Sequence, residues 1–175
     1  MDAERFDALV AAHHGEIYRY LLRATSRQSE ADDLAQDTFL RAYRAHRGLP
    51  PDANARAWLF TIASNVAKNH FRAESRRRRA HAAVRETRSE TDGVGPEGET
   101  LFNEAWAVLD TAVAGLPLKQ RLAFTLRKVH DLDYDAIARS LDCSLDSARA
   151  HVFQALRKIR RSLNGCELPL GRDER

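Results

Sequence analysis

The sequence contains little that would support catalysis or metal binding. Among its 175 residues are two cysteines, Cys143 and Cys166, and their spacing fits neither a disulfide framework nor a zinc site. No catalytic triad, glycine-rich phosphate loop or metal-ligand spacing is visible. We therefore expect no enzymatic activity, no catalytic residue, no metal and no cofactor.

Long apolar segments are also missing. No run approaches the ~20 apolar residues that a membrane-spanning helix needs. No signal peptide opens the chain, because the first residues lead directly into an amphipathic pattern. These two absences predict a cytoplasmic protein that makes no direct membrane contact.

Charge, in contrast, is abundant and unevenly placed. Charged residues make up 30% of the chain and the formal net charge is +3, which is compatible with nucleic-acid binding without requiring it. Acidic residues cluster at positions 30–37, whereas basic residues cluster at 72–79 and 149–161. This asymmetry predicts surfaces that meet different partners.

The segment 133–163 predicts two helices joined by a short turn. Asp133 is placed to cap the first helix and Ser144 to cap the second. Opposite the apolar stripe of the second helix, or beside its start, lie residues that we call the groove face: Ser147, Arg149, Ala150, Phe153, Gln154 and Arg157. Arginine and glutamine side chains read base edges in the major groove, which admits a helix. A solvated surface helix, or a hairpin that packs on a partner, would explain the same pattern.

Helical spacing also marks the start of the chain. It runs from Phe6 to Leu22, where Gly15 is a candidate break, and it resumes over 30–46, where Tyr43 is expected in the buried stripe. The outer side of this second helix carries what we call the acidic face: Asp33, Gln36, Asp37 and Leu40. The helix dipole alone explains acidic residues at the start of a helix. The outward leucine favours a face that docks on a partner.

A third helix is predicted from Ala55 to about Arg72. Asn54 precedes it as a cap. Together with this cap, the polar residues off its core stripe form what we call the amide face: Asn54, Arg56, Asn65, Lys68, Asn69 and Arg72. Basic and amide side chains on one side of a helix can grip phosphates and hydrogen-bond unpaired bases. A solvated polar face is the competing interpretation.

Composition changes after this helix. Four consecutive arginines at 76–79 are followed by SETDGVGPEGET, which is typical of a flexible linker. Helical spacing resumes near Leu101, and Gly115 is placed for a left-handed helix cap. The predicted fold is all-α, with two small helical domains joined by a flexible linker and a helix-turn-helix in the second. The expected boundaries are 1–80 for the first domain, 81–100 for the linker, 101–164 for the second domain and 165–175 for a C-terminal tail.

Taken in order, these motifs resemble bacterial RNA polymerase sigma factors of the extracytoplasmic-function (ECF) group. The resemblance is carried by DDLAQDTFLRAYR at 32–44, WLFTIASNVAKNHFR at 58–72, LPLKQR at 116–121, and YDAIARSLDCS at 134–144 followed by the basic helix. Two motif sets in this order, separated by a polar linker, are far more specific than a lone helix-turn-helix.

The resemblance implies an alternative sigma factor that binds RNA polymerase core and directs promoter-specific transcription initiation. It implies that the acidic face docks on the clamp helices of the largest polymerase subunit, and that the flap of the second-largest subunit is also contacted. The loop 46–54 and the amide face would capture the non-template strand of the −10 element, and the groove face would read the −35 element. An anti-sigma factor is an expected partner.

The reading helix departs from the family pattern. Ala150 and His151 stand where a Ser-Arg pair is common, and Gln154 stands where an arginine is common. Glutamine suits adenine better than guanine, so we expect a shifted −35 preference. The alternative function is a stand-alone helix-turn-helix regulator that binds duplex DNA. Such a regulator should bind its site unaided, whereas a sigma factor should bind DNA weakly alone and direct polymerase core.

Overall fold

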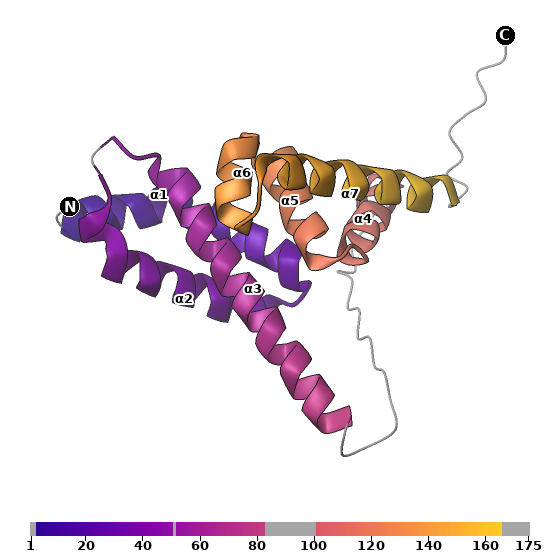
Figure 1. Ribbon diagram of the computed structural model, residues 1–175, viewed down its shortest axis with the longest axis horizontal. Helices are drawn as coiled ribbons and strands as arrows, with labels where there is room; N and C mark the ends of the chain where they lie inside the picture. Colours follow the sequence, from indigo (N-terminus) through magenta and orange to yellow (C-terminus); the bar gives the residue numbers. More distant parts are fainter. Residues whose placement is uncertain (1–2, 51, 83–100, 166–175) are drawn as a thin grey trace, which may run out of the picture.

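The computed structural model describes residues 3–50, 52–82 and 101–165, and the regular elements over these residues are all helices. The N-terminal domain consists of α1 (Ala3–Thr25), α2 (Gln28–Ala45), the 3-10 turn η1 (His46–Gly48) and α3 (Ala55–Ala82). The C-terminal domain consists of α4 (Leu101–Ala114), α5 (Leu118–Lys128), α6 (Tyr134–Leu141) and α7 (Leu145–Gly165). Figure 1 shows their arrangement. The all-α prediction is confirmed. Nearly all of the linker predicted at 81–100 and of the tail predicted at 165–175 falls outside the described residues.

Helix α1 is continuous through Gly15, so the predicted break there is wrong. A glycine inside a helix costs about 0.5–1 kcal/mol relative to alanine. Burying one large apolar side chain contributes about 1.5–3 kcal/mol. Phe6 before the glycine and Ile17 and Leu21 after it are all buried on one side of α1, and their burial outweighs the local preference.

Helix α3 extends to Ala82, well beyond the end predicted near Arg72. Its last turns protrude from the body of the molecule (Figure 1). The apolar stripe stops before these turns, which is why helical spacing did not indicate them. Arginine, alanine and glutamate nevertheless favour helix, and an Arg78–Glu74 ion pair one turn apart adds to this.

The helix-turn-helix forms as predicted. Asp133 caps α6 by accepting a hydrogen bond from the backbone N–H of Ala136 at 2.6 Å, and Ser144 Oγ accepts from the N–H of Ser147 at 3.2 Å at the start of α7. The turn between the helices is closed by Asp142 in the left-handed region, with φ of 53°. The predicted left-handed cap at Gly115 is wrong. This residue follows α4 outside the left-handed region, and its N–H bonds Thr111 O at 3.1 Å in helical fashion.

The two domains pack against each other. Helix α6 lies along α3, and α4 and α5 contact α1 (Figure 1). One buried apolar cluster crosses this boundary, since it contains Leu59 and Phe60 of α3 together with Ile137 and Leu141 of α6. A second cluster lies within the C-terminal domain and consists of Val113, Leu116, Phe124, Ala155 and Ile159. Among the helices described, none combines the length and the apolar character that crossing a bilayer requires.

Candidate polymerase and nucleic-acid interfaces

The groove face lies on the side of α7 that points away from the core. Ala148 and Val152 on the opposite side are fully buried, whereas the Phe153 side chain is 65% exposed. Arg149, Ala150, Gln154 and Arg157 are also exposed, and Ser147 is partly so. Among the large apolar side chains that the structure describes, Phe153 is the most exposed. The structure therefore brings the six predicted residues together on one accessible surface.

Two residues of the groove face are pre-positioned by neighbours. The Arg149 guanidinium lies 3.5 Å from the Asp146 carboxylate and 5.8 Å from the centre of the Tyr134 ring. The Gln154 side-chain oxygen accepts a hydrogen bond from Gln120 of α5 at 2.7 Å. Gln154 then presents its amide NH₂ as a donor, and its oxygen retains a second lone pair that can accept from adenine in a two-bond contact.

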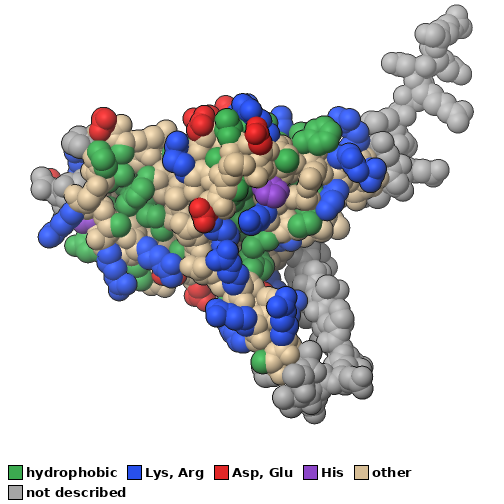
Figure 2. Space-filling view, viewed as in Figure 1, with side chains coloured by type: hydrophobic (Ala, Val, Ile, Leu, Met, Phe, Trp, Pro, Cys, Tyr) green, Lys and Arg blue, Asp and Glu red, His purple; other side chains and the backbone are tan. Residues whose placement is uncertain are grey.

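The amide face is divided by the structure. Asn65, Asn69 and Arg72 are exposed and follow one another at helical spacing along one side of α3. Asn54 caps the helix by accepting from the backbone N–H of Ala57 at 2.9 Å. Figure 2 shows Lys and Arg side chains gathered along the protruding end of α3, where this exposed side continues. The structure thus brings half of the predicted set into one accessible row.

Arg56 is engaged in the domain boundary instead. Its guanidinium contacts both carboxylate oxygens of Glu16, with the shortest distance 2.9 Å, and donates to the backbone oxygen of His130 at 2.8 Å. Burial acts to raise the pKa of Glu16, but the hydrogen bonds and positive charges of Arg56 and His13 outweigh it, so the pKa lies below its usual value. This carboxylate is held ionised as the partner of Arg56.

Lys68 is buried, although its position off the core stripe of α3 predicted a solvent-facing side chain. Only 7% of its surface is exposed, and Nζ donates to the backbone oxygen of Ser140 in α6 at 3.3 Å. This burial lowers the pKa of Lys68. The periodicity of α3 reports only the faces of α3, so it could not reveal that α6 covers this one.

The acidic face of α2 carries more apolar surface than the sequence indicated. Asp33 and Gln36 are exposed, the Asp37 carboxylate pairs with Arg41 at 2.9 Å, and Leu40 is 50% exposed. Tyr43, which we placed in the buried stripe, is 52% exposed, and that expectation is wrong. It lies one helical turn after Leu40, so the spacing alone could have added it to this face.

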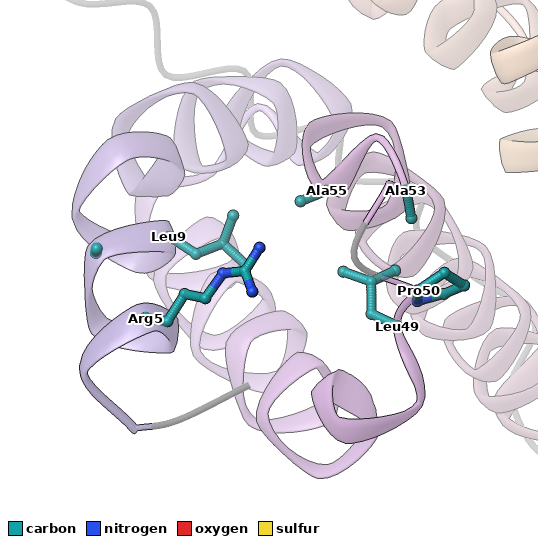
Figure 3. Close-up of a pocket in the computed structure, with 7 residues that line it drawn as sticks. Arg5, Leu9, Leu49, Pro50, Ala53 and Ala55 are labelled. Atoms are coloured by element: carbon teal, nitrogen blue, oxygen red, sulfur yellow. The ribbon is translucent and has the colours of Figure 1, made fainter.

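A hollow of about 280 Å³ lies beside the loop that precedes α3 (Figure 3). The first turns of α1 contribute Arg5, Ala8 and Leu9, and the loop side contributes Leu49, Pro50, Ala53 and Ala55. Figure 3 shows the side chains of Arg5 and Leu9 directed toward the loop. The side chains that line the hollow are apolar apart from Arg5.

Comparison with known proteins identifies the family. Residues 9–77 match the sigma-70 region 2 family, and residues 106–159 match the sigma-70 region 4 family. The RNA polymerase sigma-H factor of Pseudomonas aeruginosa is 32% identical over 169 residues, which cover 93% of this chain and 88% of that protein. The ECF RNA polymerase sigma-E factor of Haemophilus influenzae is 30% identical over 166 residues, covering 90% of this chain and 87% of that protein. The chain belongs to the ECF group of bacterial sigma factors.

Solved structures share the fold of this sigma factor. The sigma factor RpoE of Bartonella quintana, crystallised with the anti-sigma factor NepR, has a TM-score of 0.73 at 21% identity and covers 93% of this chain and 98% of its own. CnrH in complex with the cytosolic domain of CnrY has a TM-score of 0.66 at 21% identity, covering 94% and 90%. The predicted family and fold class are confirmed. As an alternative sigma factor, the protein binds RNA polymerase core and promoter DNA and directs transcription initiation, which favours this function over a stand-alone regulator.

Proposed function

We propose that three separate faces divide the work of this sigma factor: the acidic face docks on polymerase, the amide face captures the −10 element, and the groove face reads the −35 element. The observation that carries this proposal is the exposure of the whole groove face on a helix whose other side is buried. The working domains are residues 1–80 and 101–164, joined by a linker at 81–100 and followed by a tail at 165–175.

The acidic face is proposed to dock on the clamp helices of the largest polymerase subunit. Asp33 and Asp37 supply charge, and Leu40 with the neighbouring Tyr43 supplies apolar area. Interfaces gain most of their energy from a few central apolar or aromatic anchors surrounded by polar groups. The flap of the second-largest subunit is proposed as the contact of the C-terminal domain.

Charge reversal tests this docking. Asp33→Arg with Asp37→Arg should weaken binding to polymerase core by about a hundredfold or more, because like charges then oppose each other across the interface. Binding is measured by titrating labelled sigma factor with core enzyme. Glu4→Arg with Asp7→Arg adds the same charge at the exposed start of α1, outside the acidic face, and serves as the control. Equal affinity of the two double variants would refute the docking assignment.

The loop 46–54 and the amide face are proposed to hold the melted non-template strand. Exposed Asn65 and Asn69 offer amide groups to base edges, and Arg72 offers charge to phosphates. The hollow between α1 and this loop is suited to one unstacked base, whose removal from the stack costs a few kcal/mol. Arg56 and Lys68 are proposed to join this face when the C-terminal domain has moved away.

The groove face is proposed to read the −35 duplex, with Gln154 setting base preference. Gln154→Arg should move that preference toward guanine, because arginine donates two bonds to the guanine edge. A transcription-based selection with reconstituted holoenzyme over a library of upstream sequences measures the change. An unchanged preference would remove Gln154 from the set of readers.

The chain is proposed to act as a dissociable initiation subunit, without enzymatic activity, in the cytoplasm. The family consists of regulatory initiation factors, which supports this view. We also propose an anti-sigma partner. The structural relative RpoE was solved with the anti-sigma factor NepR, and CnrH was solved with the cytosolic domain of CnrY. Co-purification of the tagged protein, followed by inhibition of in vitro transcription with the recovered partner, tests this proposal.

A further inference from the structure

Polar contacts join the C-terminal domain to α3 and α1 at several points. Beyond the Arg56–His130 and Lys68–Ser140 contacts described above, the hydroxyls of Thr61 and Ser140 lie 3.1 Å apart. Arg121 of α5 donates to the backbone oxygen of Ala24 at the end of α1 at 2.5 Å. Two of these contacts use residues of the amide face, Arg56 and Lys68. The boundary between the domains therefore engages part of the amide face.

The turn between α5 and α6 inserts an aromatic ring into the N-terminal domain. The centre of the His130 ring lies 4.7 Å from that of Phe60 and 5.8 Å from that of Tyr20, and both of these residues are fully buried. His130 itself is 6% exposed. A ring placed this deeply couples the position of the turn to the packing of α1 and α3.

The apolar core is continuous across the same boundary. Ile137 and Leu141 of α6 belong to the buried cluster that contains Leu59 and Phe60 of α3. Closely packed apolar side chains stabilise an arrangement in proportion to the area removed from water. We call the arrangement in which the C-terminal domain packs on α3 and α1 the closed state. It combines apolar packing with hydrogen bonds, whereas two domains joined only by a flexible linker have neither between them.

From these contacts we propose that the C-terminal domain acts as an autoinhibitory cover, which withholds Arg56 and Lys68 from promoter DNA until the two domains separate. The proposal rests on the proposed function of the amide face. Lys68 is almost completely buried, so it reaches a phosphate only after its bond to Ser140 breaks. In the same step, Arg56 loses its hydrogen bond to the His130 carbonyl and can then contact DNA. Asn65, Asn69 and Arg72 remain exposed in both states.

A reversible crosslink tests whether the closed state exists in solution. Cys143→Ser and Cys166→Ser first remove the native thiols. Thr61→Cys with Ser140→Cys then replaces two side-chain oxygens 3.1 Å apart, a separation compatible with disulfide formation. Thr61→Cys with Arg139→Cys is the matched control, since Arg139 is the exposed neighbour of Ser140 on α6. Mild oxidation should link the first pair rapidly and leave the control largely unlinked. Equal rates for the two pairs would contradict the proposal that the domains pack together in solution.

The crosslinked protein tests whether closure covers the DNA-binding residues. Oxidised Thr61→Cys/Ser140→Cys holoenzyme should form open complexes on a promoter recovered by the selection about tenfold or more slowly than the reduced form. Dithiothreitol should restore the rate. If the oxidised protein opens the promoter as fast as the reduced form does, closure does not mask Arg56 and Lys68 and the proposal is wrong. If wild-type holoenzyme also fails to transcribe, the proposed function fails, whereas the crosslinking yield still decides closure.

A second variant protects the test against misfolding of the cysteine pair. His130→Ala removes the ring that packs on Phe60 and Tyr20 and leaves a cavity at the boundary, which weakens the closed state. Fluorescence transfer between dyes on the two domains should fall relative to wild type, and binding to the single-stranded −10 segment of the same promoter should increase several-fold. Asp131→Asn, in the exposed position that follows, is the control. Unchanged transfer in His130→Ala, with its helix content intact, would contradict the proposed cover.

Discussion

Helices α7 and α3 both carry predicted DNA-binding residues, but the structure treats them differently. The groove face of α7 is accessible throughout, because the core of its own domain lies behind it. The amide face of α3 is shared between solvent and α6, so that Arg72 is free whereas Lys68 is buried. Amphipathic spacing therefore identifies the face that a helix turns away from its own domain. It does not show whether another domain covers that face.

The largest expected effect comes from replacing one phenylalanine by alanine in each of these two helices, Phe60 in α3 and Phe153 in α7. Phe60→Ala should lower the free energy of unfolding by about 3–5 kcal/mol, because it leaves a cavity in the cluster shared by both domains. Phe153→Ala should change it by no more than about 0.5 kcal/mol, because this side chain is in solvent. Urea denaturation monitored by circular dichroism measures both. A similar loss for Phe153→Ala would mean that the groove face is part of the core.

The second largest effect concerns DNA binding by α7, whose groove face is accessible. Arg157→Ala should weaken binding of the holoenzyme to the −35 duplex by about tenfold and make that binding less dependent on salt. Filter binding over a range of salt concentrations measures both quantities. Lys128→Ala removes an exposed charge from the end of α5 and is the control. A loss of equal size in Lys128→Ala would point to overall charge instead of a contact made by α7.

The packing of the C-terminal domain on α3 should depend on pH through His130. Burial lowers the pKa of His130 from 6.5 to about 4; the Glu16 charge opposes this shift, and Arg56, Arg23 and Arg19 add to it. The fully buried Tyr20 also faces the ring. The closed state thus prefers the neutral ring, so its stability is fully present above pH 6.5 and is lost as the pH falls toward 4. Between pH 7.5 and 5.5 the closing equilibrium should shift toward open by about tenfold.

Fluorescence transfer between the domains measures this shift. His130→Phe keeps an aromatic ring in place and should remove the dependence on pH over this range. Glu16 does not interfere, because its pKa lies below 4.5 and its contribution to closure is lost only in more acidic solution. Retention of the pH response in His130→Phe would assign the titration to a different group.

The smallest effect separates two roles of Asn54. Asn54→Ala removes the cap of α3 and should cost about 1 kcal/mol of stability. Asn54→Ser retains a capping oxygen and should cost only a few tenths of a kcal/mol. Capture of the −10 strand should weaken in both variants if the amide itself contacts DNA. If only Asn54→Ala weakens capture, Asn54 acts through the helix and makes no contact of its own.

The correct predictions and the errors have distinct physical origins. Asp133, Ser144 and Asn54 were predicted as caps because capping depends on groups within a few residues of each other, and all three form the expected hydrogen bonds. The exposure of Tyr43 was missed because it depends on what neighbouring helices cover, and a pattern within one helix does not report this. The length of α3 was missed because its last turns have no apolar stripe and depend on helix propensity and the Arg78–Glu74 pair.

By itself, the sequence determined the all-α class, the helix-turn-helix and the three polar faces, because each follows from local spacing and from side chains that act within one or two turns. Only the tertiary structure decided that α6 covers Lys68, that Arg56 is shared between Glu16 and the His130 carbonyl, and that one apolar cluster crosses both domains. The polar contacts among these join residues that lie 40 to 74 positions apart. They arise when apolar surface is removed from water between segments whose patterns carry no information about each other.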